Sequence, residues 1–219
     1  METDLTFWGH ACIQLTRAGR SLVIDPGSFS DRASLATVDA VLVTHEHVDH
    51  VVMDELAGAV VERSTLEVWA PRGVVDLLAD TGASGERLHA VRGGDRFTAA
   101  GFEITTVGDV HALIHVDVPR VANVAFVIDG AILHPGDSFT VPEAGEEQIA
   151  VLLAPVSAPW LSVREVIDFV RAVRPRRVVP IHSALLSDVG NALVDRLVAG
   201  MGGADYQRLA VGETIAVTY

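Results

Sequence analysis

Apolar residues gather in short runs separated by turn residues, a pattern that is typical of β-strands. Asp39–Thr44 is a continuous apolar run, as in a strand that is buried on both faces. Asp129-Gly130 separates two further runs and is the strongest short hairpin signal in the chain. These patterns predict strand-forming stretches at residues 5–15, 21–25, 39–44, 66–70, around 97, 102–107, 123–128, 131–133, 149–153, 177–181 and 215–218.

Helical periodicity is confined to fewer segments. Residues 73–80 carry an apolar face that ends before Gly82. Ser162-x-x-Glu165 is a capping box that opens a helix predicted to reach residue 173, and another helix is expected over 187–199. Strands and helices alternate without a long linker or repeat. We therefore expect an α/β architecture with mixed sheets and a single domain over residues 1–219.

The strongest chemical signal is Thr44-His45-Glu46-His47-Val48-Asp49-His50, which follows the predicted strand 39–44 directly. Four potential metal ligands fall within six residues at the end of a rigid element. In such a loop, His45 and His47 can face one centre while Asp49 and His50 face another. A solvated polar turn is the alternative, but such turns are usually filled by Asn, Gly, Ser and Lys rather than His.

His45-x-His47-x-Asp49-His50 resembles the signature of the metallo-β-lactamase fold superfamily of metal-dependent hydrolases. The resemblance extends over nearly the whole chain and implies a four-layer αββα sandwich, in which helices flank two mixed β-sheets. It also implies a metal centre at one edge, where loops from both sheets meet. Further ligands should follow in the order His, Asp, His, each after its own strand.

Three later residues match that order. The resemblance implies one ion held by His45, His47 and His111, a second held by Asp49, His50 and His182, and Asp137 as a bridge between them. Two divalent ions are therefore expected, with zinc as the first choice and manganese or iron as alternatives. His115, four residues after His111, competes with it as the ligand.

The segment Gly9-His10, followed by Ile24-Asp25-Pro26-Gly27, is similar to a compact branch of this superfamily that includes the ascorbate-phosphate lactonase. That similarity implies hydrolysis of a small phosphorylated, lactone or ester substrate. The zinc β-lactamases use other ligands for the second metal, including a Cys, and this chain has no Cys in that region. β-Lactam hydrolysis is therefore not expected.

Five other residues are candidates to support the ligands or contact the substrate. Asp25 is expected to accept a hydrogen bond from a His ligand, because such ligands need a partner on their other ring nitrogen. His10 can lie at the rim of the site or be a buried structural residue. Asn123 can hold the preceding loop, contact substrate or serve as a turn residue. Ser138 can donate near the metals or within a local turn, and Trp160 can wall the pocket or pack in the core.

Composition narrows the range of partners. The chain has 219 residues, with 16 cationic residues, all Arg, against 29 Asp and Glu, so its formal net charge is -13. Without Lys, Schiff-base lysine chemistry and a P-loop are excluded. The acidic balance argues against nucleic acid as a partner, whereas a local metal centre can still attract a small anionic substrate. The basic run Arg164–Arg177 is typical of a solvated helix face. Alternatively, it could bind a phosphate or an acidic partner subunit, and a homo-oligomer is therefore possible.

The cellular setting is indicated by what the sequence lacks. Its start is acidic and without a signal-peptide pattern, and its longest apolar stretch is too short to cross a bilayer. We therefore expect a cytoplasmic protein with no membrane partner. The single Cys12 cannot form an internal disulfide.

Together, these residues predict an enzyme, a hydrolase that cleaves an ester, lactone or phosphoester bond of a small molecule. A hydroxide bound by two metal ions would be the nucleophile, since such ions lower the pKa of bound water from about 15.7 towards about 7. Asp49 is the candidate catalytic residue, because it can orient the water and accept its proton. The alternative is a non-hydrolytic metal-binding, redox or sensor protein on the same fold. A small nuclease is a third hypothesis, which the net charge disfavours.

Overall fold

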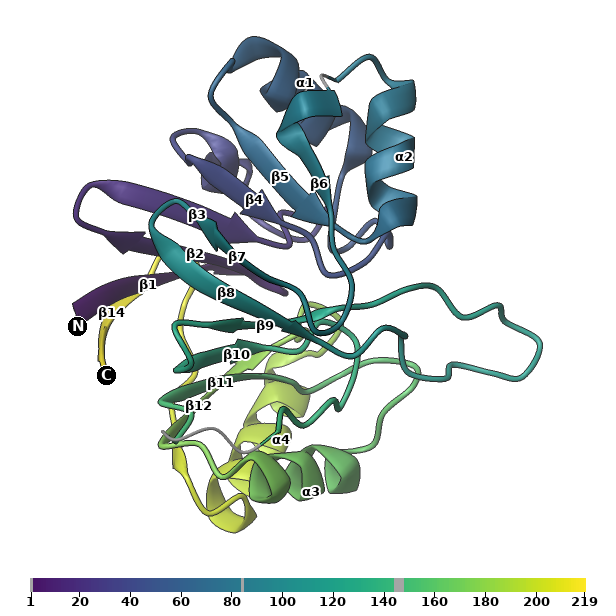
Figure 1. The fold of residues 1–219 in the computed structure, drawn as a ribbon. Coiled ribbons are helices and arrows are strands. Elements are labelled where there is room, and N and C mark those ends of the chain that lie inside the picture. The colour runs from purple at the N-terminus through teal and green to yellow at the C-terminus, as the bar shows by residue number, and fades with distance from the viewer. Residues whose placement is uncertain (1, 84, 144–147) are drawn as a thin grey trace.

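The computed structural model describes residues 2–83, 85–143 and 148–219. Two seven-stranded sheets lie face to face, and a pair of helices covers the outer face of each sheet (Figure 1). One apolar core lies between the sheets, and two further cores lie between each sheet and its helices. The four layers follow the order α, β, β, α, so the expected αββα sandwich is confirmed.

The first sheet has the strand order β14-β1-β2-β3-β4-β5-β6. Its strands are β1 (Glu2–Gly9), β2 (Cys12–Arg17), β3 (Arg20–Ile24), β4 (Ala40–Leu42), β5 (Glu67–Ala70), β6 (Leu88–Ala90) and β14 (Thr214–Thr218). The strands from β14 to β3 pair antiparallel, and those from β3 to β6 pair parallel. Helices α1 (Met53–Glu62) and α2 (Arg72–Asp80) bury apolar residues such as Leu56 and Leu78 against it. A short 3-10 helix precedes β4 (η1, Arg32–Leu35) and another precedes β6 (η2, Gly85–Arg87).

The second sheet has the order β13-β12-β11-β10-β9-β8-β7. Its strands are β7 (Arg96–Ala99), β8 (Phe102–Val107), β9 (Ala125–Ile128), β10 (Ile132–His134), β11 (Val151–Pro155), β12 (Arg177–Ile181) and β13 (Asp205–Tyr206). The strands from β7 to β10 pair antiparallel, and those from β10 to β13 pair parallel. Helices α3 (Val163–Val173) and α4 (Asp188–Met201) cover its outer face.

The central core fixes the two sheets relative to one another. Leu5 and Phe7 alternate with more exposed residues along β1, and Phe102 and Ile104 do the same along β8. Complete burial of one such side chain contributes about 1.5–3 kcal/mol. Because this core is shared by both sheets, the loops that leave their edges keep a fixed spacing.

The structure differs from the predicted elements at a few places. Residues 5–15 contain two strands rather than one, since the chain reverses at His10, whose φ is 50°. Helix α1 was not predicted, because its start at Val52 has no side-chain hydrogen bond that would mark a cap. Strand β6 was also missed, as it has only three residues and depends on pairing with β5.

The loops that carry the candidate ligands leave both sheets at one edge of the sandwich. Asp25 follows β3, the motif 45–50 follows β4, Asp137 follows β10 and His182 follows β12. The loop between β8 and β9, residues 108–124, projects beyond the rest of the molecule (Figure 1). Among the helices of the described residues, none combines the length and hydropathy that a membrane crossing requires.

Candidate metal centre

Loops from both sheets bring His and Asp side chains together in two adjacent groups. The first group is His45, His47, His111 and Asp137, and the second group is His10, Asp49, His50 and His182. Within each group, one potential ligand atom per residue lies within 4.8 Å of all the others. All seven sequence-predicted ligands lie in these groups, and the buried His10, for which a rim position and a structural role were both open, joins the second.

The spacing within the first group suits a shared ion. His45 Nε2 lies 3.0 Å from His47 Nδ1, and His111 Nε2 lies 3.3 Å from Asp137 Oδ2. Two ligand atoms that each lie about 2.0–2.1 Å from one tetrahedral ion are separated by roughly 3.3 Å. The observed separations therefore correspond to neighbouring ligands of one ion.

Asp137 lies between the two groups. Its Oδ2 faces His111, whereas its Oδ1 lies 3.1 Å from His50 Nε2 and 3.3 Å from His182 Nε2. In the second group, His182 Nε2 also lies 3.4 Å from Asp49 Oδ2. Asp137 thus presents one oxygen to each group, which is the arrangement that a bridging ligand requires.

Buried polar atoms without a hydrogen-bond partner are concentrated here within the described part of the chain. They include His50 Nε2, His111 Nε2, His182 Nε2 and Asp137 Oδ1. Leaving one buried polar group unsatisfied costs about 1–3 kcal/mol, so native structures avoid it. Cations placed between these atoms would satisfy all of them, and the residues therefore fit a metal centre.

The other nitrogen of these imidazoles faces an oxygen atom. The pairs are His45 Nδ1 with Thr44 Oγ1, His50 Nδ1 with Asp25 Oδ2, His111 Nδ1 with the carbonyl oxygen of Ala112, and His182 Nδ1 with that of Ser157. An N–H at Nδ1 donates to each oxygen, so that Nε2 is the ring nitrogen directed into the centre. Hydrogen bonds outside the groups therefore fix the orientation of these four side chains.

Asp25, the sequence candidate for a hydrogen-bond partner of a His ligand, contacts His50 and Thr44. Its fully buried carboxylate accepts hydrogen bonds from Thr44 N at 2.8 Å and from Thr44 Oγ1 at 2.7 Å, and lies 2.7 Å from His50 Nδ1. Its φ is 52°, and His10 and His182 are also left-handed, at 50° and 58°. Such conformations cost about 1–3 kcal/mol and are characteristic of functional sites.

The carboxylates of the centre raise the pKa of two neighbouring imidazoles, because they stabilise the protonated form. Burial by itself would lower the pKa of His50, but Asp137 and Asp25 outweigh it and raise that pKa to about 10. Burial is likewise outweighed at His182, where Asp137 and Asp49 raise the pKa to about 9. At His45, burial dominates and holds the pKa well below its usual value, so this imidazole is neutral.

The remaining sequence candidates have distinct places. Asn123 is buried and binds the Asp137 loop, donating to the carbonyl oxygen of Pro135 and accepting from Asp137 N. Its side chain therefore holds the following loop, and its backbone N–H donates to the carbonyl oxygen of Asp109 in the preceding one. The Ser138 hydroxyl donates to the carbonyl oxygen of Pro135, which is the local turn contact of the two alternatives given for this residue. Trp160 is half-buried and donates from Nε1 to Asp137 Oδ2 at 2.8 Å.

His115 does not belong to either group. Its side chain is 62% exposed on the projecting loop, where it contacts Asp117, whereas His111 is buried within the first group. In the basic run, Arg171 and Arg176 donate to backbone carbonyl oxygens of Met201 and Thr218. These contacts favour a surface role for that run.

A family model described as a β-lactamase superfamily domain matches residues 4–182. The chain is 32% identical over 223 residues to Protein Rv0786c of Mycobacterium tuberculosis, a match that covers 99% of this chain and 100% of that protein. It is 27% identical over 222 residues to a UPF0173 metal-dependent hydrolase of Myxococcus xanthus, covering 90% of this chain and 77% of the relative.

Solved structures share the fold at lower identity. Igni18, a metallo hydrolase of Ignicoccus hospitalis, has a TM-score of 0.76 and 20% identity, with 100% of each chain covered. CmlA, a diiron β-hydroxylase of Streptomyces venezuelae, has a TM-score of 0.67 and 17% identity, covering 97% of this chain and 54% of that one. The same fold therefore carries both hydrolytic and oxidative metal chemistry.

Proposed function

Because the chain belongs to the metallo-β-lactamase superfamily of metal-dependent hydrolases, we propose that it uses two divalent ions to hydrolyse an ester, lactone or phosphoester bond of a small molecule. The unpartnered, buried Nε2 and Oδ1 atoms of the two groups carry this proposal. They are aimed at common points, and their donor set of imidazole and carboxylate suits zinc, manganese or iron. The proposal takes residues 1–219 as one hydrolase domain.

The ligand assignment follows the two groups. The first ion would be held by His45, His47 and His111, the second by Asp49, His50 and His182, and Asp137 would contact both. When bound, two such ions lower the pKa of a coordinated water and polarise the bond under attack. The imidazoles and carboxylates supply the fixed geometry that this chemistry needs.

Asp49 is the best placed acid–base group of the centre. Its side chain is 22% exposed, whereas those of His50 and Asp137 are almost fully buried, so it faces the open side of the centre. Burial would raise the pKa of Asp49, but the hydrogen bond from His10 and the neighbouring His182 and His50 imidazoles outweigh it and hold that pKa well below its usual value. The carboxylate is therefore ionised at neutral pH and can orient a water or hold its proton.

Metal content followed by a substrate panel tests this function. Protein purified without added metal is expected to contain close to two divalent ions per chain and to turn over at least one ester, lactone or phosphoester. Elemental analysis gives the ion count, and product release measured before and after chelation gives the activity. Full metal occupancy without turnover of any member of the panel would contradict the hydrolase.

An oxidative role is the second candidate, because a diiron hydroxylase shares the fold. The same donor set can bind iron. Two iron ions per chain, together with oxygen consumption that depends on a supplied reductant, would favour this role over hydrolysis. Two zinc ions per chain in the purified protein would speak against it, since zinc has no redox chemistry.

A further inference from the structure

Four apolar residues, which we call the apolar rim, are associated with the centre: Phe29 and Trp160 through ring contacts, and Leu113 and Leu185 through their place in the chain. The Phe29 ring lies 5.2 Å from the His10 ring, and the Trp160 ring lies 6.1 Å from the His111 ring. Leu113 and Leu185 follow His111 and His182 within three residues, and both are more than half exposed. The rim therefore places large apolar surfaces beside both groups.

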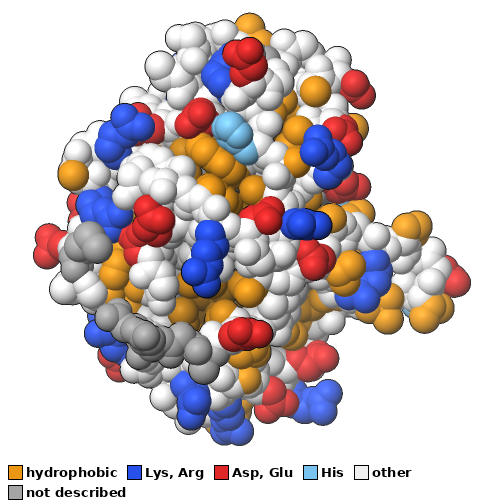
Figure 2. Space-filling model, viewed as in Figure 1, with side chains coloured by type: hydrophobic (Ala, Val, Ile, Leu, Met, Phe, Trp, Pro, Cys, Tyr) orange, Lys and Arg blue, Asp and Glu red, His pale blue; other side chains and the backbone are white. Residues whose placement is uncertain are grey.

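The same loops offer few charged partners to a substrate. Residues 157–161 and 183–187 contain no charged side chain. On the projecting loop, Arg120 donates from Nε and Nη2 to the carbonyl oxygen of His111, so these two donors are already used. Hydrophobic side chains also cover much of this loop at the side of the molecule (Figure 2), including Val116, which is 80% exposed. Recognition of a phosphate group normally relies on free guanidinium donors.

We propose that the substrate is a carbonyl ester or lactone whose apolar part lies against this rim, rather than a phosphoester. Exposed apolar surface that adjoins a reactive centre is typical of a ligand-binding site. In the reaction, one water adds to the carbonyl carbon, the ester C–O bond breaks, and a carboxylic acid and an alcohol are released. This inference rests on the proposed hydrolase function.

The test compares p-nitrophenyl acetate, butyrate and octanoate with bis(p-nitrophenyl) phosphate, using the metal-loaded protein. We expect kcat/KM to rise about tenfold from acetate to octanoate, because a longer chain covers more of the rim. Leu113→Ser and Leu185→Ser should lower the octanoate rate more than the acetate rate. Leu193→Ser, which changes an exposed leucine on α4, should leave the ratio of the octanoate rate to the acetate rate unchanged.

Two results would overturn the substrate class while still supporting a hydrolase. One is a kcat/KM that does not rise from the acetate to the octanoate ester, and the other is faster turnover of the phosphodiester than of the octanoate ester. An unchanged chain-length preference in both Ser variants would also overturn it. Absence of turnover for all four compounds with two ions bound would instead speak against the proposed function itself.

His10 provides an independent observation, because its hydrogen bonds run opposite to those of the neighbouring imidazoles. Its Nε2 lies 3.2 Å from Asp49 Oδ2, and its Nδ1 accepts from the backbone N–H of Ala184 at 3.4 Å. An imidazole that accepts at Nδ1 carries its proton on Nε2. His10 therefore donates from Nε2 to Asp49, whereas His50 and His182 use Nδ1 for their hydrogen bonds and present Nε2 to the centre.

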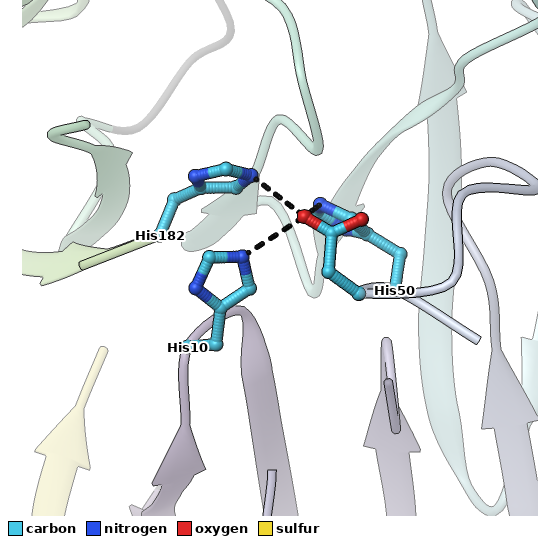
Figure 3. A group of neighbouring side chains, drawn as sticks. His10, His50 and His182 are labelled. Atoms are coloured by element: carbon cyan, nitrogen blue, oxygen red, sulfur yellow. Dashed lines mark hydrogen bonds and ion pairs between the residues drawn. The ribbon is translucent and has the colours of Figure 1, made fainter. Parts of the chain in front are cut away.

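The geometry points to His10 as a positioning residue that fixes the Asp49 carboxylate, and not as a fourth ligand of the second ion. Figure 3 shows the side chains of His10 and His182 directed at the same carboxylate from two sides. To ligate an ion, Nε2 of His10 would have to lose its proton to Nδ1, which faces the N–H of Ala184. The His10 backbone is also held beside the centre, since its carbonyl oxygen accepts from His182 N at 2.8 Å.

Metal titration of two variants tests this role. His10→Gln keeps an N–H donor near the position of Nε2, whereas His10→Ala removes it. We expect His10→Ala to weaken binding of the second Co²⁺ ion about 10–100-fold while leaving the first unchanged, as for other residues that orient ligands. His10→Gln should bind both ions within about threefold of the unmodified protein, with the same Co²⁺ absorption spectrum when fully loaded.

The Co²⁺ absorption spectrum separates a positioning residue from a ligand of the second ion. A changed absorption band in fully loaded His10→Gln would show that a ligand had been lost and would overturn the positioning role. An unchanged affinity for the second ion in His10→Ala would overturn it as well. Because His10→Gln retains the buried contacts of a long side chain, it keeps the test decisive if His10→Ala fails to fold.

Discussion

His182→Ala is expected to lose the second ion and to lower kcat/KM by about a thousandfold or more. His182 Nε2 lies 3.3 Å from Asp137 and 3.4 Å from Asp49, so its removal opens one side of the second group. A loss of ~4 kcal/mol of transition-state stabilisation corresponds to this factor, and a catalytic metal contributes several kcal/mol. Elemental analysis and ester or phosphoester turnover on the same sample measure both effects.

His115→Ala is the matched control, because it removes the same side chain from an exposed position outside both groups. It should retain two ions and full activity. His182→Gly serves as a second variant, since glycine adopts the left-handed φ of 58° at this position without strain. If His182→Ala or His182→Gly binds two ions with unchanged affinity, the ligand assignment of His182 is wrong.

Removal of the metal is expected to abolish activity and to lower the thermal midpoint of unfolding by roughly 10 °C. An ion that binds only the folded state at about a thousand times its Kd stabilises that state by about 4 kcal/mol, and 1 kcal/mol shifts the midpoint of a protein of this size by about 2–4 °C. Without cations, the buried nitrogen and oxygen atoms of the centre lose their partners. Thermal unfolding with and without a chelator measures the shift.

The His182→Ala variant is the control for this effect, because it should already lack one ion and therefore show a smaller shift. Adding back a divalent ion to the chelated protein should restore both the midpoint and the activity. An unchanged midpoint in protein that elemental analysis shows to be metal-free would mean that the centre does not contribute to folding stability in this way.

The motif 45–50 was visible in the sequence because its ligands are local and follow a buried strand. Backbone geometry after β4 determines their spacing, so no distant contact is needed to place them together. His111, Asp137 and His182 could be assigned in order only through resemblance to a family, since each lies on a different strand end. Helix α1 escaped prediction, because tertiary packing rather than a capping residue defines its start.

The roles of single residues depended on contacts that sequence spacing does not encode. Ser138 adjoins Asp137 in the chain, yet its hydroxyl is directed back to Pro135. Trp160 is far from Asp137 in sequence, yet its indole N–H donates to that carboxylate. Which neighbour a polar side chain binds is decided by the packing around it, and local sequence leaves several options open.

By itself, the sequence determined the residue types of the centre, their attachment to strand ends and the absence of Lys, because these are properties of composition and short-range pattern. Only the tertiary structure decided which nitrogen of each His faces the centre. Those choices depend on hydrogen bonds between distant segments, as in His50 with Asp25, His182 with Ser157 and His10 with Ala184. Because a ring nitrogen cannot both carry a proton and bind a metal, these long-range partners distinguish candidate ligands from the residue that positions them.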